Sequence, residues 1–116
     1  MSRIERINPG RIYSDAVDYH GFVFLRGMTA KDTSKDIKGQ TADILAQIDA
    51  ALEERGTDKT RLLSAQIWLS DITLRDAMNE VWTAWVPPGQ APARACVESK
   101  LAAPNMLVEI MVVACK

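Results

Sequence analysis

Apolar and polar residues follow one another along this chain with two different periods, and the period changes from segment to segment. Where apolar residues alternate with polar ones, or run together over a few positions between turn-forming residues, the pattern predicts β-strands. Six segments fit that description: residues 4–7, 13–19, 22–27, 62–69, 92–98 and 106–115. A turn at residues 18–21 contains the only histidine, His20, and we expect a solvated turn residue there rather than a catalytic one.

Two further segments carry apolar residues three or four positions apart, which predicts amphipathic helices. Gly56 is well placed to end the first helix, and Pro87 ends the second. The first stripe consists of Ile37, Thr41, Ile44, Leu45, Ile48 and Leu52, and the second of Leu74, Met78, Val81, Trp82 and Trp85. Both stripes are typical of core packing.

The resulting order, β-β-β-α-β-α-β-β, mixes strands and helices within 116 residues, which is the size of one domain. We therefore expect a single α+β domain over residues 1–116, with two helices on one face of a mostly antiparallel sheet. The last strand, residues 106–115, is apolar on both faces. Either its second face is buried against another copy of the chain, which we favour, or it is the central strand of a half-exposed sheet.

Each of the last two strands carries a charge where a core strand would be apolar. Glu109 alternates with Leu107 and Met111, and a carboxylate buried there without a partner would be costly. Arg94 shares the face of its strand with Cys96. Our interpretation is that Arg94 and Glu109 meet in a cleft, where the arginine fork suits a ligand carboxylate. A structural Arg–Glu ion pair, or two charges facing solvent, would explain the same pattern.

Composition narrows the class of function. The 14 Lys and Arg residues nearly balance the 15 Asp and Glu residues, so the net charge is −1 and the pI about 5.8. Such a balance gives no indication of binding to nucleic acid or to an anionic membrane. Residues 1–6 contain no hydrophobic signal region, and Cys96 and Cys115 lack the spacing of a metal or redox motif. We expect free thiols and a cytoplasmic protein.

Several motifs, taken in order, carry a family resemblance. They are Gly-Gln-Thr at 39–41, Met-Asn-Glu-Val-Trp at 78–82, Pro-Ala-Arg-Ala-Cys-Val-Glu at 92–98 and Val-Glu-Ile at 108–110. With them the chain resembles the RidA (YjgF) family of reactive-intermediate imine/enamine deaminases, as a divergent member. The resemblance implies a chorismate-mutase-like domain that assembles as a homotrimer, with the sheets forming a central barrel and the sites in clefts between subunits.

The resemblance also implies a reaction. Such proteins hydrolyse 2-iminopropanoate, 2-iminobutanoate and their enamine tautomers to 2-keto acids and ammonia, without metal or cofactor. By resemblance, Arg94 grips the substrate carboxylate, and Glu109 positions or activates the attacking water. Cys96 matches a cysteine whose backbone carbonyl contacts the imine nitrogen, and no activated thiol is indicated. Tyr13 matches an aromatic pocket residue and Asn79 a polar residue near the cleft, although both suit packing or capping equally.

One position departs from the family pattern. Active members of the best-studied subgroup commonly have serine just before the glycine that matches Gly27, and this chain has Arg26. Alternation places Arg26 on the face of Phe22 and Phe24, where it either reaches solvent or adds a second cation to the site. A second cation favours a dianionic ligand or displaces the imine. The alternative function is therefore non-catalytic binding or sensing of a keto or amino acid, and nucleic-acid action is the least favoured class.

Overall fold

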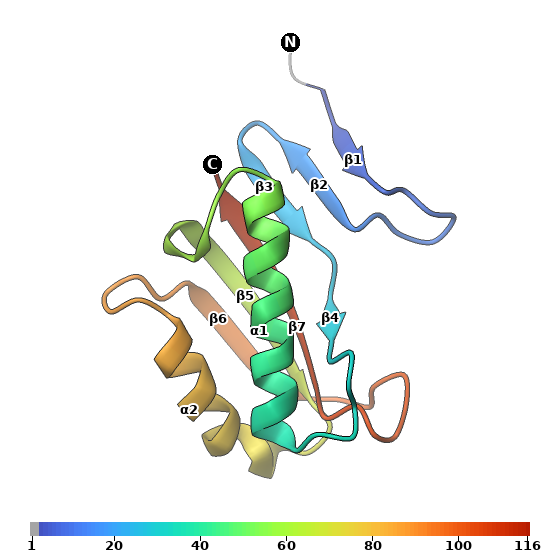
Figure 1. Ribbon diagram of the computed structural model, residues 1–116, viewed down its shortest axis with the longest axis vertical. Coiled ribbons are helices and arrows are strands. Elements are labelled where there is room, and N and C mark those ends of the chain that lie inside the picture. The colour runs from blue at the N-terminus through green and yellow to red at the C-terminus, as the bar shows by residue number, and fades with distance from the viewer. Residues whose placement is uncertain (1–2) are drawn as a thin grey trace.

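The computed structural model describes residues 3–116. The predicted domain begins at Met1, so its first two residues, Met1 and Ser2, lie outside the described residues. The strands are β1 (Glu5–Ile7), β2 (Ala16–Tyr19), β3 (Phe22–Leu25), β4 (Met28–Thr29), β5 (Leu62–Leu69), β6 (Ala93–Glu98) and β7 (Val108–Cys115). The helices are α1 (Ile37–Glu54) and α2 (Arg75–Trp85), with short 3-10 turns at Lys59–Arg61 and Ile72–Leu74 (Figure 1). The predicted order of elements is confirmed, with the two-residue strand β4 in addition.

The strands form one sheet in the order β1-β2-β3-β7-β5-β6, and β4 also pairs with β7. The described pairings are antiparallel except for that of β5 with β6, which is parallel. The prediction of a mostly antiparallel sheet is therefore confirmed. β7 lies at the centre, with β3 and β4 along one side and β5 along the other.

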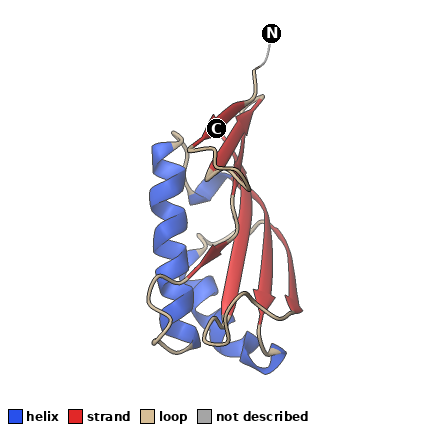
Figure 2. Ribbon diagram, turned by 90° about the vertical axis from the view of Figure 1, so that its right-hand side faces the viewer, coloured by secondary structure: helices blue, strands red, loops and turns tan. Residues whose placement is uncertain are grey.

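Both helices lie on the same face of the sheet, as predicted (Figure 2). The core forms between them and the residues of the sheet that point toward them, because that is where apolar surface leaves water. Its fully buried members are contributed by both helices and by the central strands: Ile44, Ile48, Leu52, Ile67, Leu69, Met78, Val108, Ile110 and Val112. Neither helix within the described residues is long and apolar enough to cross a membrane.

Local signals fix the ends of α1 and the first hairpin. The Asp36 carboxylate accepts a hydrogen bond from the backbone N–H of Gly39 at 2.9 Å, which caps the N-terminus of α1. Gly56 ends the helix with a φ of 79°, a conformation that favours glycine. His20 and Gly21, with φ of 52° and 80°, form the tight turn between β2 and β3. The predicted helix end and the predicted turn are both confirmed.

A charged cluster lies at the end of the sheet face beneath the helices, which we call the covered face. Asp18 on β2 is only 7% exposed, and its Oδ2 lies 2.7 Å from both Arg55 Nη2 and Lys116 Nζ. Burial raises the pKa of Asp18, but hydrogen bonds and attraction from Arg55 and Lys116 together outweigh burial and lower it. The cluster links β2 to Arg55, just after α1, and to Lys116, just after β7.

The opposite face of the sheet carries no helix (Figure 2). We call it the open face, and its large apolar side chains include Phe22, Phe24, Val97 and Met111, each about 40% exposed. The prediction that the last strand is apolar on both faces is confirmed, because Met111 and Val113 alternate with buried Ile110 and Val112.

Candidate functional site

Glu109 projects from the middle of the sheet onto the open face. Its neighbours across β7 are Thr29 on β4 and Trp68 on β5. The residue is half-buried, yet within residues 3–116 its carboxylate forms no ion pair and accepts no hydrogen bond. An unpartnered carboxylate in partly apolar surroundings is unfavourable for folding and is typical of a functional group.

The carboxylate of Glu109 rests against the backbone at Gly27, between β3 and β4. A Cβ atom at position 27 would collide with Oε2 of Glu109 and would lie 3.2 Å from its Cδ. Any larger residue at position 27 would make the Glu109 carboxylate move, so Gly27 is what permits this close approach. Local alternation in the sequence does not reveal this contact.

A cavity of about 570 Å³ opens in front of these two residues. Its lining includes Tyr13, Arg26, Gly27, Glu109 and Met111. The structure thus brings together three of the predicted site residues, namely Tyr13, Arg26 and Glu109. The cavity is mostly apolar, as expected for a site that binds a small organic molecule with few polar contacts.

β3 ends at Leu25 rather than at the predicted residue 27, and Arg26 borders the same cavity as Phe24, as its predicted face requires. Its backbone N–H donates to the Asp15 carbonyl at 3.1 Å. Its guanidinium donates through Nη1 to the carbonyl of Gly27 at 3.0 Å, and Nε lies 3.4 Å from Asp15 Oδ1. The side chain borders the cavity while its charge is paired with Asp15.

Arg94 lies elsewhere, on β6 at the edge of the sheet. Its Nη1 donates to Asn79 Oδ1 of α2 at 2.8 Å, and its guanidinium carbon lies 5.4 Å from the centre of the Trp82 ring. These contacts hold the arginine by hydrogen bonding and a cation–π interaction. Within the described part of the chain Arg94 pairs with no carboxylate, so a structural Arg94–Glu109 ion pair inside one chain is excluded.

Arg94 and Glu109 lie on opposite faces of the sheet. Arg94 is opposite Ala65 on β5, and Glu109 is opposite Trp68. Ala65 is buried beneath the helices, and Trp68, an odd number of residues later, points to the open face. Within one chain the two charges therefore do not meet in a cleft. One half-site contains Arg94, Asn79 and Cys96, and the other contains Glu109, Gly27, Tyr13 and Arg26.

Cys96 shares the face of Arg94 and is half-buried. Burial raises the pKa of its thiol, and attraction from Arg94 and Arg75 opposes that rise without cancelling it. The thiol is thus less ionised than an ordinary cysteine, which is unfavourable for a nucleophile. Among residues 3–116, no three His, Cys, Asp or Glu side chains lie together in a way that would hold a metal ion.

Comparison with known proteins finds similarity along the whole described chain. Residues 3–116 match the family described as Endoribonuclease L-PSP. A RutC family protein of Haemophilus ducreyi is 39% identical over 111 residues, covering 96% of this chain and 95% of that protein. RutC family protein YoaB of Escherichia coli is 40% identical, covering 96% of each chain.

Solved structures agree with these sequence matches. A member of the YjgF protein family from Neisseria meningitidis superposes with a TM-score of 0.94 at 46% identity, covering 98% of this chain and 95% of that chain. A member of the conserved Rid protein family from Yersinia pestis, a protein of unknown function, gives a TM-score of 0.85 at 25% identity over the full length of both.

Proposed function

The chain belongs to the YjgF/RutC family of Rid proteins, and we propose that it hydrolyses small 2-imino acids or their enamine tautomers to 2-keto acids and ammonia. The observation that carries the proposal is a cation and an anion without ion-pair partners in the described chain, Arg94 and Glu109. Such a reaction needs one group to hold a carboxylate and another to handle a proton of water. We place it in the cytoplasm, without metal or cofactor.

In the proposed reaction, Arg94 binds the substrate carboxylate through the two parallel donors of its guanidinium. Asn79 and Trp82 already hold that guanidinium, so little freedom is lost when the substrate binds. Glu109 accepts a proton from a water molecule whose oxygen attacks C2 of the imine. Glu109 passes that proton to the nitrogen, which gives a carbinolamine. The proton of its new hydroxyl group then passes through Glu109 to the amino group, the C–N bond breaks as the C=O bond forms, and ammonia and a 2-keto acid leave.

The two half-sites lie on opposite faces of one sheet, so we propose that each complete site forms between two copies of the chain. A head-to-tail interface in a closed ring brings one patch of each copy onto a different patch of the next. A homotrimer of this kind would bury the open face, where Phe22, Phe24 and Met111 are about 40% exposed. The sheets would then enclose a central barrel.

A second candidate is a protein of this fold that binds a keto or amino acid without turning it over. Arg26 favours it, since this cation borders the cavity that contains Glu109. Action on RNA, which the family description names, is less favoured because the net charge is −1.

The test is hydrolysis of 2-iminobutanoate, generated in situ by an amino-acid oxidase and followed by semicarbazide trapping. We expect the wild-type protein to accelerate loss of the imine and Arg94→Ala to reduce kcat/KM about 100-fold or more, since it loses a bidentate charged contact. Arg3→Ala is the matched control, because Arg3 is exposed and lies before β1.

Three other outcomes would redirect the proposal. Equal turnover by Arg94→Ala and wild type would contradict the role of Arg94. Calorimetric binding of 2-ketobutyrate by a protein that turns over no imine would favour the binding protein. Salt-sensitive RNA binding by the pure protein would return the nucleic-acid class to consideration.

A further inference from the structure

We propose that Asp15 and Arg26 act together as a positioning pair for Glu109, holding the backbone of Gly27 against which the Glu109 carboxylate rests. Arg26 then serves the site through Gly27 and is not a second ligand for the substrate carboxylate. The inference rests on the proposed function, because it assigns how the proton-accepting group of that site is kept in place.

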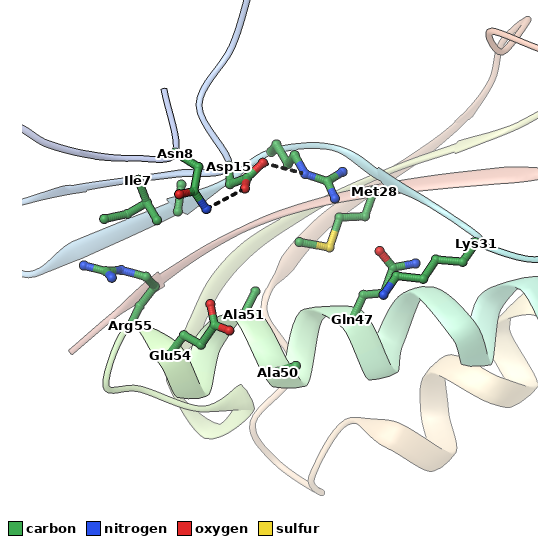
Figure 3. Close-up of a pocket in the computed structure, with 12 residues that line it drawn as sticks. Ile7, Asn8, Asp15, Met28, Lys31, Gln47, Ala50, Ala51, Glu54 and Arg55 are labelled. Atoms are coloured by element: carbon green, nitrogen blue, oxygen red, sulfur yellow. Dashed lines mark hydrogen bonds and ion pairs between the residues drawn. The ribbon is translucent and has the colours of Figure 1, made fainter. Parts of the chain in front are cut away.

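Asp15 is the anchor of the pair. Its Oδ2 accepts a hydrogen bond from Asn8 Nδ2 at 3.0 Å, and its Oδ1 lies 3.4 Å from Arg26 Nε; these are the two dashed contacts of Asp15 in Figure 3. Its backbone N–H donates to Ile7 at 2.9 Å, and its carbonyl accepts from the N–H of Arg26 at 3.1 Å. Asp15 is therefore held from the ends of both β1 and β3.

The contact that reaches the site comes from the other end of the same guanidinium. Arg26 Nη1 donates to the carbonyl of Gly27 at 3.0 Å, while Nε of the same guanidinium lies 3.4 Å from Asp15 Oδ1. Because a Cβ at position 27 would collide with Glu109 Oε2, the carboxylate lies directly on this backbone. Displacement of the Gly27 peptide must then displace the carboxylate or open a gap beneath it.

Arg26 stands between two cavities, and its compensating anion lies on the side away from Glu109. Arg26 lines both the 570 Å³ cavity of Glu109 and a second cavity of about 350 Å³ between the β1–β2 segment and α1. Asp15 lines that second cavity, and Figure 3 shows its side chain beside Asn8, opposite the α1 residues. Besides Glu109, the titratable residues that line the first cavity are Arg26 and Tyr13. Without the Asp15 charge, Arg26 would have Glu109 as the nearest available anion in that lining.

The test uses Asp15→Asn, Arg26→Gln and the double variant, each with 2-iminobutanoate as substrate. Each single change should lower kcat about tenfold and leave KM nearly unchanged, because Arg94 and not Arg26 binds the carboxylate. The double variant should be no worse than the worse single variant, since the two residues act as a unit. Arg26→Lys should recover part of the loss, because lysine retains the charge that Asp15 binds.

A spectroscopic measurement separates this inference from the proposed function. The backbone amide signal of Gly27 should move in Asp15→Asn, whose substituted residue is not a chain neighbour of Gly27. It should stay in place in the control Arg3→Gln, at an exposed position before β1, whether or not the protein turns over imines. If the wild type is inactive and the Gly27 signal moves in Asp15→Asn, the proposed function is wrong and the positioning pair is still supported.

Two results would overturn the positioning pair. One is an unmoved Gly27 signal together with unchanged or fully additive losses of kcat. The other is a rise of KM in Arg26→Gln with kcat preserved, for 2-iminobutanoate or for a dicarboxylic imine, because that would make Arg26 a direct substrate ligand.

Discussion

The two faces of the sheet differ in how far a single chain completes them. Ile110 and Met111 are neighbours on β7, yet Ile110 is fully buried under the helices and Met111 is 40% exposed. Each face also contains a carboxylate in the sheet. Asp18 on the covered face has two cations at 2.7 Å, whereas Glu109 on the open face has no ion-pair partner within residues 3–116.

This difference indicates that the covered face mainly stabilises the single chain, whereas the open face is suited to contact with another molecule. The centre of the covered face has the properties of a finished core, with apolar packing and, at Asp18, a compensated charge. Arg94, at the β6 edge of that face, has no carboxylate partner within residues 3–116. The open face combines exposed apolar residues with an unpaired charge, which isolated domains avoid and interfaces between copies tolerate. A substitution on either face should therefore reveal the distinction.

The largest effect on stability is expected on the covered face. Ile110→Ala should lower the free energy of unfolding by about 3–4 kcal/mol, because it leaves a cavity where the surroundings cannot collapse. Met111→Ala, its neighbour, should act through association instead. Urea unfolding at several protein concentrations separates the two, since only the Met111→Ala deficit should change with concentration. A concentration-independent loss in Met111→Ala equal to that of Ile110→Ala would contradict the contrast.

An intermediate effect is expected for the compensated carboxylate. Asp18→Asn leaves Arg55 and Lys116 beside a neutral group, and we expect a loss of about 2 kcal/mol at pH 7. The direction with pH follows from the lowered pKa of Asp18. A carboxylate of lowered folded-state pKa stabilises the fold above its unfolded pKa of about 4, and this stability disappears as the pH falls through the folded value.

The measurement for Asp18 is thermal unfolding from pH 7 down to pH 2. Wild type should lose more stability than Asp18→Asn as the solution becomes acidic, so the two curves should converge. Parallel curves would mean that other carboxylates account for the acid sensitivity.

The smallest effect is expected at Cys96. Partial burial raises the pKa of its thiol, and the resemblance assigns a role only to its backbone carbonyl, which serine retains. Cys96→Ser should therefore keep kcat/KM for 2-iminobutanoate within about threefold of wild type. Loss of turnover in a folded Cys96→Ser protein would instead make the thiol a participant in the reaction.

Local patterns in the sequence were sufficient for both helices and for every strand except the two-residue β4, but not for the arrangement of these elements. The periodicity at residues 62–69 predicts the bounds of β5, and Gly56 predicts the end of α1. The parallel pairing of β5 with β6 was not predictable from alternation. Alternation shows which residues of one strand share a face, but not which strand lies beside it or which of the two sheet faces that is. For the same reason the sequence could not place Arg94 and Glu109 on opposite faces.

The contacts that position charges were also outside the reach of local patterns. Asp18 pairs with residues 37 and 98 positions away, and such distances leave no mark on periodicity. The strand that contains Phe22 and Phe24 was expected to reach residue 27, but it ends at Leu25. Arg26 borders the cavity of Glu109 as alternation suggested, whereas its ion pair with Asp15 could not be read from alternation. The resemblance supplied the candidate site residues, and the fold divides these candidates between the two faces of the sheet.

The most direct test of a site shared between copies is recovery of activity in mixed assemblies. Arg94→Ala and Glu109→Gln, each inactive alone, are co-expressed in equal amounts and assayed with 2-iminobutanoate. In a ring where each site takes Arg94 from one copy and Glu109 from the next, random mixing leaves about one quarter of the sites intact. A parallel mixture of wild type with the doubly substituted chain should also retain about one quarter, rather than the half expected of sites within one chain. Recovery near one quarter would support the shared site, and mixed assemblies as inactive as their parents would contradict it.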